Sequence, residues 1–370
     1  MKIPRSTFPR RALQAGVAAL LASLAAAAAA KDYIVTACRP GTLVVIDAQE
    51  RKVVHAHPLP NGSKGHGPGA IVISPDGKVA YVLHNHWETV SGIDIDSGQE
   101  VFRAELSAGS VRGKSFNGMD LSPDGKELAV YVVRNELLPG EYQPRDPHIA
   151  VFDTAAGVKA EPVRTLPAPR RVGNLLWAPS GKTLYAFGWE MLKLDPQTGA
   201  VQGMHPFRSW KRTGFGQADT LNFWPQHEQS GVFVSPYFVP RTDRKPDSPE
   251  AMKAGLWTLD LKTDKVAFKE FENASVVLFS SVVNPMKQHE VFTVFNQLTR
   301  TDMRSGKSER VDLDHSFYSV NMSSDGREVY IGGAQGEVAF YDAQSLKKLG
   351  AVQMPGGADQ SASSLRVVRR

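Results

Sequence analysis

A short motif that recurs along the chain constrains the fold more than any other feature of the sequence. Its clearest copy spans 320–342, where an apolar segment leads into Ser-Ser-Asp-Gly, a second strand-like segment, Gly-Gly and a third segment ending at Asp342. Asp-Gly between two segments of β character is a strong hairpin signal, because glycine accepts the positive φ of a tight turn. Related turns occur at 73–77, 121–125 and 177–181. This self-similarity predicts a repeat fold.

The second half of the motif, a strand-like segment that ends in aspartate, recurs more evenly. The seven aspartates lie about 40 to 65 residues apart and are Asp47, Asp94, Asp153, Asp195, Asp260, Asp302 and Asp342. In several copies a glycine follows the aspartate by four residues, at Gly98, Gly157, Gly199 and Gly306. We predict that each carboxylate accepts backbone N–H groups within a turn. A period of this length is typical of four-stranded propeller blades.

The two ends of the chain indicate how such a ring would close. After the first thirty residues the chain opens partway through a unit, at Tyr33, and it ends with one orphan strand at 364–368. Pairing these ends removes two exposed sheet edges. We therefore predict an all-β fold for residues 31–370, as one domain: a seven-bladed β-propeller of four-stranded blades, closed by pairing of the N- and C-terminal strands. The blades after the split first one are expected at about 70–107, 117–166, 172–206, 219–272, 275–313 and 316–354.

Residues 1–30 have the composition of a cleaved secretory signal peptide. A basic head, with Lys2 and Arg5 at its start, precedes an apolar run at 12–30 that ends in small residues. The pair at 10–11 leaves twin-arginine export open, although the Ala-Leu-Gln that follows favours Sec export. An uncleaved anchor is the competing interpretation, but the alanine-rich run is marginal as a membrane span. We expect a periplasmic protein.

Charge and cysteine content exclude several functions. The formal net charge of +5 falls to about +1 without the first thirty residues, so the basic balance indicates no nucleic-acid partner. Cys38 is the only cysteine, which excludes an intrachain disulfide and the two-cysteine attachment of a c-type haem. The sequence 35–38 resembles a lipoprotein box, but Lys31 and Asp32 separate it from the apolar run. We expect Cys38 to be an ordinary residue near a strand end.

Two histidine pairs have spacing that metal sites use. His55 and His57, and likewise His84 and His86, would share a face if they lie on strands. A zinc site usually needs a third protein ligand, and the sequence places none beside either pair. We therefore expect surface or loop histidines and no metal site.

The sequence does not contain a recognisable catalytic motif. There is no Gly-x-Ser-x-Gly elbow, and the glycine-rich 61–69 lacks the context of a phosphate loop. His315 and Glu228 could act in acid–base chemistry, but nothing in the spacing fixes a second group for either. We expect no catalytic residue and no cofactor-binding residue in this chain, and a scaffold or binding protein rather than an enzyme.

Two longer stretches are more specific than propeller patterning. They are Trp-Pro-Gln-His-Glu-Gln-Ser-Gly at 224–231 with the following 232–237, and His-Ser-Phe-Tyr-Ser-Val-Asn at 315–321 running on to Tyr-Asp at 341–342. With the opening 31–34 and 43–47, they make the chain resemble the β subunit of quinohemoprotein amine dehydrogenase over essentially all of its length after the leader. The chain departs from the family at Cys38 and in local loops.

The resemblance implies a place in a periplasmic heterotrimer. In that family a dihaem α subunit carries two c-type haems, and a small γ subunit carries a cysteine tryptophylquinone at which primary amines become aldehyde and ammonia. The catalytic base belongs to the γ subunit, so no catalytic residue transfers to this chain. The expected role is to dock the γ subunit and to help enclose its active site.

Large aromatic side chains and their neighbours are the candidates for a partner interface, because such residues dominate binding hot spots. The candidates are Trp210, Phe215, His227, Phe317 and Tyr318. The alternative for each is that it fills a gap between blades. Two insertions, at 134–147 and 240–250, could also carry contacts. Competing functions are a stand-alone periplasmic propeller that binds another protein or a surface polymer, and a hydrolytic propeller such as a lactonase.

Overall fold

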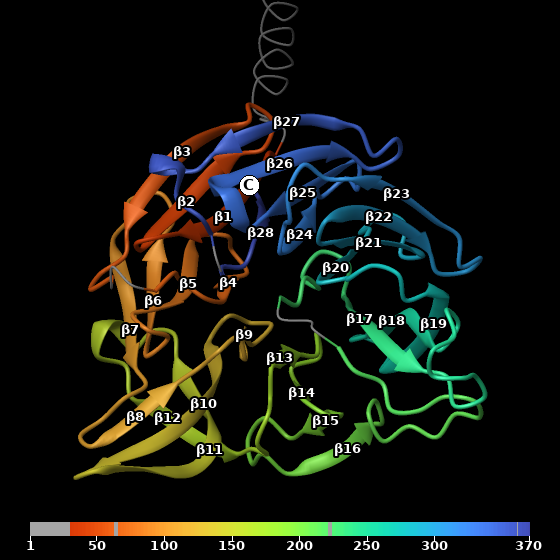
Figure 1. The fold of residues 1–370 in the computed structure, drawn as a ribbon. Coiled ribbons are helices and arrows are strands. Elements are labelled where there is room, and N and C mark those ends of the chain that lie inside the picture. The colour runs from red at the N-terminus through yellow and green to blue at the C-terminus, as the bar shows by residue number, and fades with distance from the viewer. Residues whose placement is uncertain (1–29, 63–65, 221–223, 361) are drawn as a thin grey trace, which may run out of the picture.

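The computed structural model describes residues 30–62, 66–220, 224–360 and 362–370. The predicted signal peptide therefore lies, apart from residue 30, outside the described residues. Seven antiparallel sheets surround a central axis and form a seven-bladed β-propeller, as predicted (Figure 1). The described helices are three 3-10 turns, η1 (Gly157–Lys159), η2 (Ala334–Gly336) and η3 (Pro355–Gly357). Within this part of the chain, no helix has the length and apolar character to cross a membrane.

The first four blades follow the predicted bounds closely. The first contains β28 (Arg366–Arg369), β1 (Asp32–Cys38), β2 (Thr42–Asp47) and β3 (Lys52–Pro58). The second contains β4 (Ile71–Ile73), β5 (Val79–His84), β6 (Thr89–Asp94) and β7 (Glu100–Glu105). The third contains β8 (Val111–Lys114), β9 (Met119–Leu121), β10 (Glu127–Leu138), β11 (Glu141–Asp153) and β12 (Pro162–Pro167). The fourth contains β13 (Asn174–Trp177), β14 (Leu184–Phe187), β15 (Met191–Leu194) and β16 (Val201–His205).

The last three blades complete the ring. The fifth has three strands in the described residues, β17 (Val232–Pro240), β18 (Met252–Asp260) and β19 (Lys265–Asn273). The sixth contains β20 (Ser280–Val283), β21 (Glu290–Val294), β22 (Gln297–Asp302) and β23 (Ser308–Asp312). The seventh contains β24 (Ser319–Met322), β25 (Glu328–Gly332), β26 (Glu337–Asp342) and β27 (Lys348–Gln353).

The ring closes where the two ends of the chain pair. β28 runs antiparallel to β1, with Asp32 opposite Arg369 and Val35 opposite Arg366. The backbone of Lys31 and that of Arg370 exchange two further hydrogen bonds. The C-terminal strand is therefore the innermost strand of the blade that the N-terminus begins, as the orphan strand predicts.

One insertion is more regular than expected. The segment 134–147 was expected as an insertion between strands, but it extends β10 and β11 into a long hairpin, and β8 pairs with the outer part of β10. The reason is that backbone pairing between β10 and β11, and between β10 and β8, continues the ladder beyond the blade. The third blade consequently has five strands instead of four. The other insertion, between β17 and β18, has only turns and bends from 242 to 250.

All seven aspartate turns form as predicted. Each aspartate accepts a backbone N–H from a residue two or three positions later. The four glycines that follow have φ between 73° and 75°. At Gly326, in the Ser-Ser-Asp-Gly turn, φ is 70° and an added Cβ would lie 2.3 Å from the Asn284 side chain. That turn therefore requires glycine both for its backbone and for the space.

Seven clusters of buried apolar side chains hold neighbouring blades together, one at each seam. Side chains alternate along a strand, so Ile34 packs toward the seventh blade while its neighbour Val35 packs toward the second. The seam between the fifth and sixth blades has the fewest buried members, with Val234 and Leu256 facing Val283 and Val291. At about 25 cal/mol per Å² of apolar area, these seams dominate the stability of the ring.

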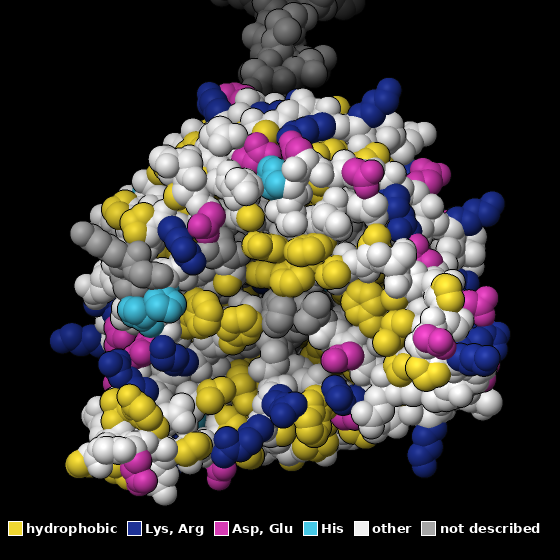
Figure 2. Space-filling model, in the orientation of Figure 1, with side chains coloured by type: hydrophobic (Ala, Val, Ile, Leu, Met, Phe, Trp, Pro, Cys, Tyr) yellow, Lys and Arg dark blue, Asp and Glu magenta, His cyan; other side chains and the backbone are white. Residues whose placement is uncertain are grey.

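The meander gives the propeller two different faces. The turns between the first and second strands of a blade, and the aspartate turns between its third and fourth, lie on one face, which we call the turn face. The connections between the second and third strands, and those from one blade to the next, lie on the other, which we call the loop face. Figure 2 looks onto the loop face, where hydrophobic side chains gather round a central hollow.

Candidate functional site

Aromatic side chains surround the loop-face end of the central channel. We call Trp87, Phe116, Phe279, Phe295 and Tyr318 the aromatic rim. Phe279 and Tyr318 come directly before the inner strands β20 and β24, which places them at the channel mouth. The centroids of the Phe279 and Tyr318 rings are 5.4 Å apart, and those of Trp87 and Phe116 are 5.0 Å apart. Ring pairs at this separation pack favourably beyond the area they bury.

The rim is asymmetric because the same backbone position carries different residues in different blades. Before the inner strands of the second and fourth blades, Gly69 and Gly173 make the backbone hydrogen bond that Phe279 and Tyr318 make in the sixth and seventh. A Cβ built on Gly173 would meet only the Phe187 carbonyl oxygen, at 3.8 Å. This position is therefore aromatic in the sixth and seventh blades and glycine in the second and fourth.

The turn-face end of the channel is crossed by the segment 224–229. The buried Arg366 guanidinium of β28 donates to the carbonyl oxygens of Ile71 and Pro225, and it forms an ion pair with Glu228. The amide of Asn321, on β24, donates to Gln226 at 3.0 Å. Side chains from the first and seventh blades thus hold this segment in place. It forms a polar floor beneath the aromatic rim, and we refer to it as the channel floor.

His227 extends the channel floor toward the third blade. Its Nε2 lies 3.7 Å from a carboxylate oxygen of Asp120, on β9. Burial by itself would lower the pKa of His227, but the Asp120 and Glu228 carboxylates outweigh burial and raise that pKa. The Asp120 carboxylate also accepts the backbone N–H of Trp177. His227 is thus an internal link between blades.

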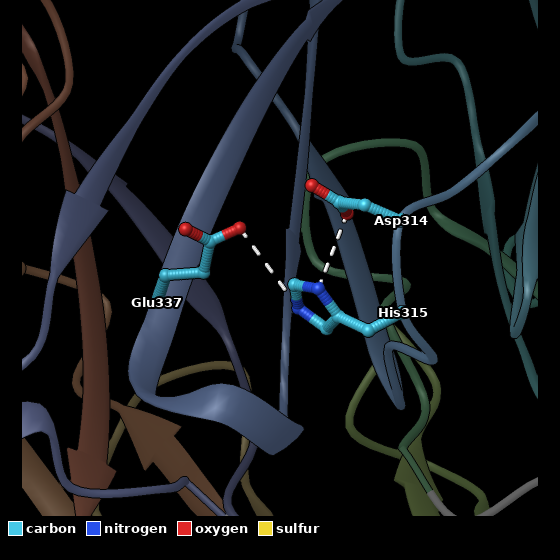
Figure 3. A group of neighbouring side chains, drawn as sticks. All are labelled: Asp314, His315 and Glu337. Carbon is cyan, nitrogen blue, oxygen red and sulfur yellow. Dashed lines mark ion pairs between the residues drawn. The ribbon is translucent and has the colours of Figure 1, made fainter.

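A second polar group lies on the loop face between the sixth and seventh blades. Asp314 and His315 follow β23, and Glu337 begins β26, so the three side chains converge from two connections (Figure 3). His315 Nδ1 is 3.1 Å from Asp314 Oδ1, and His315 Nε2 is 3.9 Å from Glu337 Oε1. The Lys348 ammonium lies 3.2 Å from Asp314 and 3.4 Å from Glu337. Burial would raise the pKa of Asp314, but Lys348 and His315 hold it below the usual value.

An exposed tryptophan marks a third feature of the loop face, on the fourth blade. Trp189 is 53% exposed, and the guanidinium of Arg171 lies 4.5 Å from its ring centroid while that of Arg208 lies at 5.7 Å. An apolar recess of about 190 Å³ opens beside the ring, with Val172 and Leu192 in its wall. Cation–π contacts hold the ring without covering it.

The structure separates the five interface candidates. Phe317 has no exposed surface and packs in the seam between the sixth and seventh blades, and His227 is buried in the channel floor. Trp210 and Phe215 pack against the seam between the fourth and fifth blades, where the Trp210 indole donates to the Gly216 carbonyl oxygen. Tyr318 belongs to the aromatic rim. Of the five candidates, only Tyr318 therefore lies at the channel mouth. That any of the five contacts a partner stays a prediction.

One histidine expectation was wrong. His84 is not a surface residue: it is 2% exposed, and Nε2 lies 2.8 Å from the Ser91 hydroxyl oxygen. β5 ends at His84 and His86 lies in the next turn with φ of 57°, so the two do not share a strand face. Burial lowers the pKa of His84 to about 4. His55 and His57 do share a face of β3, with ring centroids 5.3 Å apart.

Sequence reasoning missed how two of its residues are used. The sequence indicates His315 but not its pairing with Glu337, because Glu337 is remote in sequence and only the blade geometry brings it close. Glu228 was a candidate acid or base, and the structure pairs it with Arg366 from the far end of the chain. The predicted repeat does offer one general signal for such pairs. Polar residues at the ends of strands in neighbouring blades lie on the same face of the ring and can meet there.

Comparisons with known proteins place the chain among β-propeller proteins by its fold and indicate no family. None of the family models and none of the curated proteins compared with the chain matches it. Among solved structures, the chain is similar to a functionally unknown protein from Desulfotomaculum acetoxidans DSM 771, with a TM-score of 0.58 and 11% identity over 92% of this chain and 98% of that one. It is also similar to apo AztD from Citrobacter koseri, with a TM-score of 0.50 and 12% identity over the same shares. At such identities the likeness shows the propeller fold and nothing finer.

Proposed function

We propose that this chain is the non-catalytic propeller subunit of a periplasmic quinohemoprotein amine dehydrogenase. In this role its loop face docks the small quinone-bearing γ subunit and helps to enclose the active site of that subunit, within a heterotrimer that also holds the dihaem α subunit. The sequence stretches 224–237 and 315–342 support the family, and the seven-bladed fold agrees with it.

The observation that carries the docking proposal is the distribution of exposed aromatic side chains. Among the described residues, the aromatic rings exposed by more than a third are Phe116, Tyr142 and Trp189, and all three lie on the loop face. Exposed tryptophan and tyrosine are enriched where proteins bind one another. The turn face instead consists of short turns whose polar groups are satisfied locally.

The shape of the channel supports a role in enclosing a reaction site. The channel floor lies at the turn-face end, and hydrophobic side chains gather at the loop-face end (Figure 2). A subunit placed over the mouth would therefore be faced by apolar rings rather than by bulk water. In the proposed complex the γ subunit would supply the oxidation of a primary amine to aldehyde and ammonia, and this chain would supply walls that exclude water.

The experiment is to purify the native complex from a host grown on a primary amine and to measure the affinity of its subunits. We expect haem absorbance and a quinone-staining small polypeptide to co-purify with this chain. We expect Phe116→Asp combined with Trp189→Ala to weaken γ-subunit binding at least thirtyfold, because truncated hot-spot aromatics each cost about 2 kcal/mol.

A matched control lies on the opposite face. Met286 is 67% exposed in a turn-face loop, so Met286→Asp changes a similar apolar surface without touching the loop face. It should leave the affinity within about twofold. A haem-free, quinone-free chain that purifies alone would contradict the proposal, and so would an affinity that falls equally in the control.

A further inference from the structure

We propose that His315 and Glu337 bind one divalent transition-metal cation of the Zn²⁺ class, with Asp314 orienting the imidazole. The three side chains offer one nitrogen and two carboxylates whose ligand atoms all lie within 4.8 Å of one another. Imidazole nitrogen and carboxylate oxygen are common ligands of such cations. The proposal concerns this chain alone and does not depend on any partner subunit.

The contact between Asp314 and His315 selects the nitrogen that is free to coordinate. Asp314 Oδ1 lies 3.1 Å from Nδ1, and a carboxylate at this distance favours the tautomer whose proton is on Nδ1. Histidines that bind metals typically donate their other ring N–H to a carboxylate in this way, which fixes the ring and raises its basicity. Asp314 is therefore a positioning residue rather than a ligand.

The remaining nitrogen is poised toward Glu337. His315 Nε2 is buried and has no hydrogen-bond partner, although a buried polar atom usually has one. It lies 3.9 Å from Glu337 Oε1. With metal–ligand bonds of about 2.1 Å, a tetrahedral angle needs the two atoms about 3.4 Å apart. An approach of about half an ångström, well within the reach of a glutamate side chain, completes the geometry.

Lys348 is the built-in competitor for this position. Its ammonium bridges Asp314 and Glu337, and so balances the charge that a metal ion would balance. The Lys348 side chain is 36% exposed and can swing into water when a doubly charged cation enters. The lysine thus lowers the affinity of the site for metal. Two protein ligands also leave at least two positions for water, so the site should be weaker than a structural zinc site.

The test uses Co²⁺ as the probe, because its visible absorption reports nitrogen and oxygen coordination, followed by competition with Zn²⁺. We expect one saturable Co²⁺ per purified chain. His315→Ala and Glu337→Gln should each weaken binding at least tenfold. Lys348→Met should tighten it about fivefold, because it removes an exposed competing charge pair.

A matched control is a second histidine whose Nε2 lies at the same distance from one carboxylate but which has, among the described residues, no second carboxylate at its other ring nitrogen. His289 Nε2 also lies 3.9 Å from a carboxylate oxygen, that of Asp302, on the turn face. His289→Ala should leave Co²⁺ binding unchanged. His315 packs on Phe317 with ring centroids 4.2 Å apart, so His315→Ala could disturb the fold as well as the metal site. Thermal unfolding shows whether this variant is folded. If it is not, the result for Glu337→Gln decides whether the site binds metal. Three results would each overturn the proposal. They are Co²⁺ binding that survives Glu337→Gln, Co²⁺ affinity that Lys348→Met does not increase, and no binding to the unmodified chain at 1 mM Co²⁺.

Discussion

The two faces of this propeller are built by opposite strategies. On the turn face the same solution is repeated, in which an aspartate or a serine satisfies the backbone of its own turn and a residue with positive φ, glycine in most turns, completes it. On the loop face the blades differ: equivalent positions carry Gly173 and Tyr318, and one connection extends into the β10–β11 hairpin. Regular turns close the fold, whereas variable connections on a rigid base are available for binding.

This difference implies that substitutions on the two sides should affect different properties. Changes in the turns and in the channel floor should reduce the stability of the ring, because their hydrogen bonds join strands and blades. Changes in exposed loop-face aromatics should leave stability almost unchanged and alter binding. The predictions below run from the largest expected effect on stability to the smallest.

The largest effect is expected in the channel floor. Arg366→Met should lower the free energy of unfolding by about 3 kcal/mol, because it leaves the buried carbonyl oxygens of Ile71 and Pro225 without their donor. Chemical denaturation measures the loss. Arg370→Met is the control, since Arg370 pairs with the largely exposed Asp96 and should cost less than about 1 kcal/mol. Equal losses in the two variants would show that the floor does not join the blades.

Acid should affect the loop-face side before the turn face. Burial lowers the pKa of His84, at the loop-face end of β5, to about 4, so between about pH 6.5 and 4 the unfolded chain binds a proton that the folded chain does not. Stability is then complete above pH 6.5 and falls by roughly 2 to 3 kcal/mol as the pH drops to 4. Denaturation curves at several pH values should show this slope.

A variant separates His84 from the turn aspartates. Local hydrogen bonds hold the pKa of Asp94 and of Asp342 below the usual value, so their contribution is present above about pH 4 and is lost only below it. Burial also lowers the pKa of His148 to about 4, so His148 contributes to the same slope. His84→Gln should therefore reduce the slope between pH 6.5 and 4 by about half and leave the loss below pH 4 intact. If His84→Gln leaves the upper slope unchanged, the assignment to this histidine is wrong.

A single aspartate turn should have a moderate effect. Asp342→Ala should cost about 1 kcal/mol, because the carboxylate accepts the Ser345 backbone N–H and hydroxyl. Asp342→Asn keeps an acceptor oxygen in place and should recover most of the loss. Thermal unfolding of the two variants compares them directly, and an Asn variant as unstable as the Ala variant would mean that the charge, not the turn geometry, matters.

The smallest effect on stability is expected on the loop face. Trp189→Ala should change the free energy of unfolding by less than about 1 kcal/mol, because the ring is 53% exposed and contacts mainly two arginines. A loss above 2 kcal/mol would place Trp189 in the core rather than on a binding surface.

The repeat was sufficient to predict the blades and their turns. Each aspartate and glycine acts within a few residues of its own position, so local sequence determines what it does, and the closing strand follows from counting the units. The binding features depend instead on contacts between distant segments. Arg366 meets Glu228, and His315 meets Glu337, only because the ring places different blades side by side.

Two local expectations failed for a related reason. Nothing in the sequence around His84 shows that packing within the ring encloses its side chain, so its burial could not be predicted from its polarity. The segment 134–147 contains prolines and charges that favour a loop, yet pairing with β8 supplies the backbone partners that keep it extended. Partners outside the local sequence decided both cases.

Hydrogen exchange of this chain, free and within the native complex, tests the central claim most directly. We predict that peptides containing Phe116, Trp189 and Tyr318 on the loop face become protected in the complex, while those containing Gly326 and Met286 on the turn face exchange as before. Protection confined to the turn face, or the same exchange in both samples, would contradict a loop face that docks a partner.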